Sequence, residues 1–269
     1  MEARGVSRRA LPPLRLGGAR VFVYHDVGEG GAGDRRYAVT RTQLGSHLDE
    51  IRRGGYSVVP LTRVWSGPDG EAAPAVALTF DDGRASDYRY AYPLLMEHGF
   101  VGEFFVNPGT IGREGYLSWG EAREMLRSGM RFQSHAHDHV YLTLLSAPLL
   151  ERQMLDSKRR IEDELGGTVE FLAAPYGDLN RRVRQAALAA GYRAVCNSWD
   201  WPARPGRSTV NRVAVYARTT TEELARLLQG DPLPYLRRAT RSAVLYPAKR
   251  AVLSLRPEWL TDRAMEGAA

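Results

Sequence analysis

Short apolar runs alternate with helical stretches along this chain, and this alternation restricts the possible folds more than any other feature. The runs are rich in valine and phenylalanine and have the length of strands. They cover residues 20–24, 56–60, 75–80, 102–106, 130–133, 169–173, 192–196 and 212–216. Alternating strands and helices give parallel strands with crossover helices, and about seven or eight such units can close into a barrel. The sequence therefore predicts an α/β protein with a distorted (β/α) barrel, close to a seven-stranded (β/α)7 arrangement.

Several predicted helices begin with capping residues. A hydroxyl residue followed three positions later by a carboxylate or amide residue can satisfy free backbone donors at a helix start. The pairs are Thr40 with Gln43, Ser118 with Glu121, and Thr220 with Glu223. The same reading predicts His47 on an exposed helix face and His98 as a helix C-terminal cap.

The chain divides into an N-terminal extension (1–19), a barrel domain (20–230) and a basic C-terminal helical extension (231–269). With 269 residues, one barrel is the simplest arrangement. Prolines interrupt the place where a secretory signal needs an apolar run, and the single cysteine cannot form an intramolecular disulfide. We therefore expect a cytoplasmic protein.

The net charge of +6 comes from the C-terminal extension. No acid lies between Asp231 and Glu258, and the basic residues there are Arg237, Arg238, Arg241, Lys249, Arg250 and Arg256. Such a stretch is usually a solvated helix face, and its alternative role is peripheral contact with the anionic inner face of a membrane. Nucleic acid is not an expected partner because the stretch has few aromatic residues to stack on bases.

Polar residues follow three of the predicted strands, at the end where a parallel barrel carries its chemistry. These residues are Asp81 and Asp82, then His135, His137 and His139, then Tyr176 and Gly177. We expect them to gather on one rim.

The histidines and aspartates have the composition of a metal site. His135 and His139 share a face across a helical turn, whereas His135 and His137 share one if the strand continues. Either pair with one carboxylate could bind a divalent metal, with zinc as the expected ion, and leave a position open for water. The second carboxylate would then be available as a base.

At these residues the chain resembles the polysaccharide deacetylase family, the family 4 carbohydrate esterases that share the chitooligosaccharide deacetylase homology domain. The stretch ALTFDDG resembles the first motif, TFDDG, which implies Asp81 as the catalytic base and Asp82 as a metal ligand. The stretch HAHDH resembles the second motif, His-Ser/Thr-x-x-His, and implies His135 and His139 as the other ligands. The stretch PYG resembles the third motif, which implies the backbone amide of Tyr176 as an oxyanion donor.

The chain departs from the family pattern at three places. Ala136 stands where the second motif has a hydroxyl residue, and Ala173 stands where the third motif has an arginine that orients the base. Arg212 is a candidate substitute for that arginine. No histidine follows His139 to act as the usual general acid. We expect His25, at the end of the first strand, to take this role, as its Tyr-His context resembles the exopolysaccharide-modifying branch of the family.

The stretch SWDW follows the seventh apolar run and supplies aromatic residues at the same rim. Aromatic walls suit a sugar face or an acetyl pocket, although they also close barrel cores. The candidate substrate-binding residues are Pro175, Trp199, Trp201 and Arg212.

The resemblance implies a metal-dependent hydrolase that removes an N-acetyl group from an amino sugar in a polysaccharide, an oligosaccharide, or a lipid- or nucleotide-linked precursor. Without a secretion signal, a cytoplasmic precursor is the expected substrate. One alternative is hydrolysis of another carbon-nitrogen bond or an ester in a small metabolite. A second alternative is a non-catalytic carbohydrate-binding relative.

Overall fold

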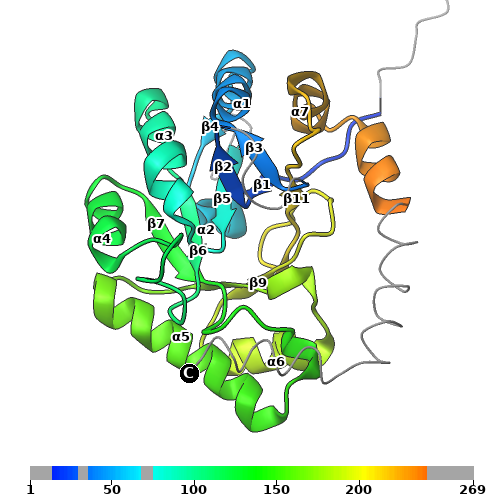
Figure 1. The fold of residues 1–269 in the computed structure, drawn as a ribbon. Coiled ribbons are helices and arrows are strands. Elements are labelled where there is room, and N and C mark those ends of the chain that lie inside the picture. The colour runs from blue at the N-terminus through cyan, green and yellow to red at the C-terminus, as the bar shows by residue number, and fades with distance from the viewer. Residues whose placement is uncertain (1–13, 30–35, 68–74, 241–269) are drawn as a thin grey trace, which may run out of the picture.

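The computed structural model describes residues 14–29, 36–67 and 75–240, in which a curled parallel sheet is surrounded by helices (Figure 1). The nine-stranded sheet has the order β10-β9-β8-β7-β6-β5-β1-β11, and β4 pairs with β5 beside this path. Its strands are β1 (Arg20–Tyr24), β4 (Ser57–Val58), β5 (Ala75–Asp81), β6 (Glu103–Val106), β7 (Arg131–Ser134), β8 (Phe171–Ala173), β9 (Ala194–Cys196), β10 (Thr209–Val210) and β11 (Val213–Ala214). The α/β fold class and the distorted barrel are therefore confirmed.

Every predicted apolar run contains a strand, and the structure adds strands that the sequence patterns did not indicate. Strands β2 (Asp26–Gly28) and β3 (Ala38–Thr40) form a separate parallel pair. Together with β10, they span only two or three residues each, which is too short for a periodic pattern to be recognised.

The two ends of the sheet are close in the chain. Strand β10 ends at Val210 and strand β11 begins at Val213, so only Asn211 and Arg212 separate the first and last strands of the sheet order. We call these two residues the closing link, because they join the ends of the curled sheet.

The helices cover the outside of the sheet (Figure 1). They are α1 (Arg41–Arg53), α2 (Leu61–Ser66), α3 (Tyr92–His98), α4 (Trp119–Arg127), α5 (Ala147–Leu165), α6 (Arg181–Ala189) and α7 (Thr221–Leu228), with a turn of π-helix, η1 (Asp87–Ala91), before α3. Helix α2 differs from the others because its Leu61 and Val64 pack with residues inside the barrel. Its first amide donates to the buried carboxylate of Glu103, at 2.9 Å, which fixes α2 at the amino end of the strands.

Strand alternation decides which residues of β5 point into the barrel. Val76, Leu78 and Phe80 belong to the large core shared with the helices, while Ala77 belongs to the interior cluster. Because side chains alternate with a period of two, the interior face of β5 continues from Ala77 to Asp81. The strand therefore carries a carboxylate into the barrel at its last residue.

The predicted hydrogen bonds from the helix backbone to the capping hydroxyl groups are confirmed. Thr40, Ser118 and Thr220 each accept a hydrogen bond from the amide three residues later. Of these three, only Ser118 has the reciprocal bond, in which Glu121 accepts from the Ser118 amide at 2.7 Å.

The prediction that His47 is exposed was wrong. The imidazole is fully buried, its Nδ1 lies 3.2 Å from the Tyr24 hydroxyl, and its Nε2 lies 3.1 Å from the Thr219 carbonyl. A carbonyl only accepts, so Nε2 carries the proton and Nδ1 accepts from Tyr24.

The first part of the predicted C-terminal extension packs on the barrel domain. Residues 232–240 are helical, with Tyr235 fully buried and Arg238 nearly so. Most of the basic stretch, residues 241–269, lies outside the described residues, as do residues 1–13 of the N-terminal extension. Among the described residues, no helix combines the length and the apolar composition that a bilayer-spanning segment needs.

Candidate active site

The first polar pair lies where β5 ends, and its two side chains diverge. Asp81 is the last strand residue and is 2% exposed. Asp82 has a φ of 80° and Gly83 a φ of 63°, so the chain turns sharply out of the strand. A Cβ atom at position 83 would lie 3.0 Å from Val106 Cγ1, so glycine fits both the conformation and the space. This turn sends Asp81 into the barrel and Asp82 toward β7.

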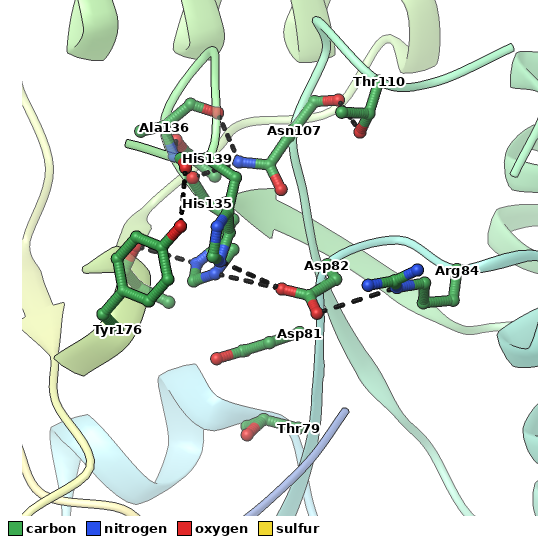
Figure 2. Close-up of polar contacts among 12 residues, drawn as sticks. Thr79, Asp81, Asp82, Arg84, Asn107, Thr110, His135, Ala136, His139 and Tyr176 are labelled. Carbon is green, nitrogen blue, oxygen red and sulfur yellow. Dashed lines mark hydrogen bonds and ion pairs between the residues drawn. The ribbon is translucent and has the colours of Figure 1, made fainter. Parts of the chain in front are cut away.

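Asp82, His135 and His139 form one group on the rim (Figure 2). One carboxylate oxygen, Asp82 Oδ1, lies 3.5 Å from His135 Nε2 and 3.3 Å from His139 Nε2. The three ligand atoms all lie within 4.8 Å of one another. Asp82 Oδ1 is buried and has no hydrogen-bond partner among the described residues. A buried carboxylate oxygen facing two imidazole nitrogens is suited to a cation, so these residues fit the divalent metal predicted from the sequence.

The imidazole of His135 is held in the form that a metal requires. Its Nδ1 lies 3.0 Å from the Ala173 carbonyl, which can only accept a hydrogen bond. Nδ1 therefore carries the proton and leaves the Nε2 lone pair directed at Asp82. Ala173, which replaces the expected arginine, thus contributes through its backbone.

The third histidine of the cluster has a different partner. His137 Nδ1 lies 3.2 Å from Asp138 Oδ1, and the structure groups only His135 and His139 with Asp82. Of the two histidine pairs considered as metal ligands, the geometry therefore favours His135 with His139.

Neighbouring side chains support the histidine loop in place of the missing hydroxyl at Ala136. Ala136 has a φ of 64°, and its amide donates to Ser134 Oγ at 3.1 Å. The buried Asn107 amide donates to the carbonyls of His135 and Ala136. Sequence reasoning missed Asn107, although it directly follows strand β6 and so carried the same positional signal as the other rim residues.

Asp81 is bound by an arginine from the closing link. Arg212 Nη1 and Nη2 each lie 2.7 Å from one oxygen of the Asp81 carboxylate, and both side chains are buried. Arg212 Nε donates to the Asn197 carbonyl at 3.0 Å, and the guanidinium packs 5.1 Å from the centre of the Phe105 ring. Arg212 is therefore in the position to orient Asp81, and it has no exposed surface for a substrate.

Both carboxylates are poised in the ionised form. Burial raises the pKa of Asp81, but the Arg212 guanidinium outweighs burial and leaves the pKa below its usual value. Burial also raises the pKa of Asp82, but the neighbouring imidazoles of His135 and His139 outweigh burial and leave the pKa well below its usual value. An ionised Asp81 can accept a proton, and an ionised Asp82 can bind a cation.

Tyr176 lies beside the metal group on the loop after β8. Its φ is 61°, its ring stacks on Tyr141 at 3.9 Å, and its edge contact with His139 has a centroid distance of 4.5 Å. Pro175 before it is buried, whereas 47% of Tyr176 is exposed. The structure thus places Tyr176 next to the metal ligands (Figure 2).

His25 follows β1 on the same rim and packs on Tyr37, with ring centres 4.7 Å apart. Its Nδ1 is buried and has no hydrogen-bond partner among the described residues. Burial leaves the pKa of His25 below its usual value, although the charges of Asp81 and Asp82 partly oppose this shift. The negative charges of the two carboxylates therefore act on the protonation of His25.

The two tryptophans of the SWDW stretch have different surroundings. Trp199 is 54% exposed, whereas Trp201 is partly buried and makes an edge contact with Tyr235 at 5.9 Å. Of the candidate substrate-binding residues, only Trp199 presents a largely exposed side chain.

Unfavourable backbone conformations are concentrated at this rim. The described non-glycine residues with positive φ are Asp82, Ala136, Tyr176 and Asp200, each just after a different strand. Such conformations persist where surrounding contacts hold them, and they cluster at functional sites. Two of these four residues, Asp82 and Tyr176, also have a chemical role predicted from the sequence.

Comparisons with known proteins agree with this geometry. The sequence profile of the family described as polysaccharide deacetylase matches residues 69–195. The chain is 32% identical over 162 residues to a peptidoglycan-N-acetylglucosamine deacetylase of Bacillus cereus, covering 58% of this chain and 72% of that protein. It is 25% identical over 176 residues to the putative polysaccharide deacetylase YxkH of Bacillus subtilis, covering 64% of this chain and 62% of that protein.

A solved structure has the same fold. The Streptococcus pyogenes deacetylase PplD superposes with a TM-score of 0.72 and 24% identity, covering 82% of this chain and 100% of that chain. The aligned part thus spans less than two thirds of the Bacillus subtilis relative and the whole of the solved structure.

Proposed function

Because this chain belongs to the polysaccharide deacetylase family, we propose that it is a metal-dependent hydrolase that removes an acetyl group from the nitrogen of an amino sugar. The observation that carries this proposal is the pairing of two neighbouring carboxylates with different partners. Asp82 faces two imidazoles, and Asp81 is held by a buried arginine. This arrangement supplies a cation site and an ionised base within one rim.

The proposed mechanism divides the chemistry among these residues. Asp82, His135 and His139 would hold the metal, which when bound makes water more acidic and polarises a carbonyl group. Asp81 accepts the proton of the attacking water, and Arg212 keeps its carboxylate ionised and directed into the site. The backbone amide of Tyr176 donates to the oxygen of the substrate carbonyl as negative charge develops there.

The leaving amine needs a proton, and we assign that donor to His25. Its position beside Asp81 and Asp82 supports this role, as does the buried Nδ1 without a partner among the described residues. With a proton supplied by His25, the carbon-nitrogen bond breaks to release a free amino sugar and acetate.

Zinc is the proposed metal. Two imidazole nitrogens and one carboxylate oxygen match a ligand set of catalytic zinc sites. The test is elemental analysis of protein purified without added metal, followed by chelation and reloading with individual divalent ions. If another ion binds more tightly and gives higher turnover, that ion and not zinc is the metal of this site.

The proposed substrate is an N-acetylated amino sugar in a lipid- or nucleotide-linked precursor, an oligosaccharide or a polysaccharide. The Bacillus cereus relative is a peptidoglycan-N-acetylglucosamine deacetylase, which supports the amino sugar. The exposed Trp199 supplies an aromatic face on which a sugar ring can pack. Mass spectrometry across these substrate classes would detect loss of an acetyl group and rank them.

Two variants test the mechanism together with metal content. Asp82→Ala should lose metal and activity together, because it removes the carboxylate that faces both imidazoles. Asp81→Asn should retain metal and lose turnover, because the base is replaced by a neutral amide. Equal hydrolysis rates for metal-stripped and metal-loaded protein would contradict the mechanism.

The alternatives remain distinguishable in the same assay. Release of formate, ammonia or another acid would identify a different carbon-nitrogen bond or an ester as the substrate. Metal binding with sugar-induced thermal stabilisation but no product would identify a carbohydrate-binding relative.

We also propose that the C-terminal region contacts the anionic inner face of a membrane. Within the described residues, the helical segment 232–240 exposes Leu233 and Leu236 beside Arg237, which suits an interface with anionic lipids. Arg238, part of the predicted basic stretch, instead points into the domain. A chain ending at Thr240 tests the contribution of the basic stretch without removing the buried Tyr235 and Arg238.

The measurement is co-sedimentation with vesicles containing anionic or only neutral lipids. We expect binding to anionic vesicles that falls on truncation after Thr240 and again in Leu233→Ser/Leu236→Ser. Unchanged sedimentation in both variants would remove the membrane proposal. The cytoplasmic location stays a prediction, and fractionation of cells producing the full chain tests it.

A further inference from the structure

Arg238, on the helical segment 232–240, makes several contacts with the barrel domain. Its Nε and Nη2 lie 2.9 and 2.8 Å from Glu223 Oε1 on α7. Its Nη2 also donates to Thr219 Oγ1 at 3.1 Å, and its Nη1 donates to the Ala214 carbonyl at 2.5 Å. The side chain is 8% exposed, so these are contacts of a buried guanidinium that fix its position.

The same guanidinium reaches the loop after β9. Arg238 Nη1 lies 3.3 Å from Asp200 Oδ1, and that oxygen also accepts from the Ala214 amide at 2.9 Å. Asp200 is 1% exposed and has a φ of 50°, so it is a buried carboxylate on a constrained backbone. A buried charge of this kind needs its partner, because removing the partner leaves the charge without compensation.

Asp200 in turn contacts the backbone of the arginine that binds the base. The Asp200 amide donates to the Arg212 carbonyl at 3.0 Å. From the other end of the same loop, the Asn197 carbonyl accepts from Arg212 Nε at 3.0 Å. The loop 197–200 therefore holds both the main chain and the guanidinium of Arg212, which binds Asp81.

The loop also carries the exposed aromatic residue of the rim. The Trp199 amide donates to Asn197 Oδ1 at 3.2 Å, so the backbone of Trp199 is fixed between Asn197 and Asp200. One loop thus connects the Trp199 side chain to the arginine that orients Asp81.

We propose that Arg238 is a positioning residue for the active site, acting through Asp200 on the loop 197–200 and on Arg212. The helical segment 232–240 then helps to hold the geometry of the active site. Arg238 touches neither the metal ligands nor the substrate, and its effect on turnover passes through the loop.

A neighbouring ion pair provides a matched control. Arg226 Nε lies 2.7 Å from Asp231 Oδ2, so this pair also ties α7 to the start of the C-terminal segment. No described contact joins Arg226 to the loop 197–200. Arg226→Met therefore weakens the attachment of the C-terminal segment without weakening the loop.

We expect Arg238→Met to lower kcat about 10- to 100-fold per metal-loaded molecule, since small misplacements of catalytic groups have effects of this size. Metal affinity should stay at the wild-type value, because the ligands follow β5 and β7. Arg238→Lys should recover part of the loss, because it restores a cation without the forked geometry. Arg226→Met should keep the wild-type kcat.

Asp200→Asn provides a second route if Arg238→Met folds poorly. If both residues act through one contact, the losses in kcat of Asp200→Asn and Arg238→Met should not add in the double variant. Additive losses, a wild-type kcat in folded Arg238→Met, or an equal loss in Arg226→Met would each overturn the proposal.

The kinetic measurement rests on the proposed function, so we add a second measurement that does not depend on activity. Amide hydrogen exchange at Trp199 and Asp200 should accelerate in Arg238→Met and stay unchanged in Arg226→Met. If the protein does not deacetylate amino sugars but shows this exchange pattern, the proposed function is wrong and the contact between Arg238 and the loop is still supported. If Arg238→Met deacetylates at the wild-type rate and its exchange is unchanged, only the positioning role of Arg238 is contradicted.

Discussion

Arg212 binds both carboxylate oxygens of Asp81, at 2.7 Å each, from a position 131 residues later in the chain. The arginine that the family pattern places before PYG is an alanine here, Ala173. A guanidinium therefore reaches the base from the closing link instead of from the third motif. The paired geometry supplies both charge and direction, and a lysine could supply only the charge.

Arg212→Met should lower kcat about 100-fold or more, because the base loses its orientation. It should also lower the free energy of unfolding by about 3 kcal/mol or more, because Asp81 becomes a buried charge without a partner. Arg212→Lys should lie between this variant and the wild type. Steady-state kinetics and urea unfolding measure the two effects, and a wild-type kcat in Arg212→Met would show that Asp81 needs no such partner.

His25→Gln should lower turnover on N-acetyl substrates by roughly 100- to 10,000-fold, the usual range for loss of a general acid. Metal content should not change, since His25 is outside the ligand group. An aryl acetate, whose leaving group departs without a proton, should be hydrolysed at nearly the wild-type rate. An equal loss on the amide and the aryl ester would exclude His25 as the proton donor.

Asn107→Ala should weaken metal binding and stability together. The variant leaves the carbonyls of His135 and Ala136 without the Asn107 donor, which destabilises by roughly 1 to 3 kcal/mol. Metal titration and thermal unfolding measure both effects. Thr110→Ala serves as the control, because the Thr110 hydroxyl donates to the Asn107 carbonyl, at 3.0 Å, and should leave metal affinity unchanged.

Stability should fall on acidification through His47. Burial lowers its pKa from 6.5 to about 4, and the hydrogen bond to the Thr219 carbonyl opposes this shift. The unfolded chain therefore takes up the proton first as pH falls. The free energy of unfolding should drop between about pH 6.5 and pH 4 by an amount on the order of 3 kcal/mol.

His47→Gln isolates this contribution, because all other titrating groups are shared with the wild type. Chemical unfolding of both proteins at several pH values should give a shallower decline in the variant. Parallel declines would show that His47 does not titrate differently on folding.

The barrel and the metal group could be predicted because each depends on local signals. The strand positions came from apolar runs, and the rim residues came from the polar positions directly after each run, as with Asp82 and His135. The error at His47 was avoidable, since Leu44, His47, Leu48 and Ile51 lie at the spacing of one buried helix face.

Contacts between distant segments could not be predicted in the same way. Nothing in the local sequence shows that Asn107 supports the histidine loop, or that Arg238 turns inward while Arg237 remains exposed. These partners depend on which strands and helices meet in three dimensions, and short strands such as β10 carry too little pattern to fix that arrangement.

The closing link has a consequence for how this protein could change during evolution. Only Asn211 and Arg212 separate Val210 from Val213. Inserting or deleting one residue there would displace the guanidinium from Asp81, because β10 and β11 on either side are held in register by pairing with β9 and β1. We therefore expect length variation at this point to lower turnover even where the barrel still folds.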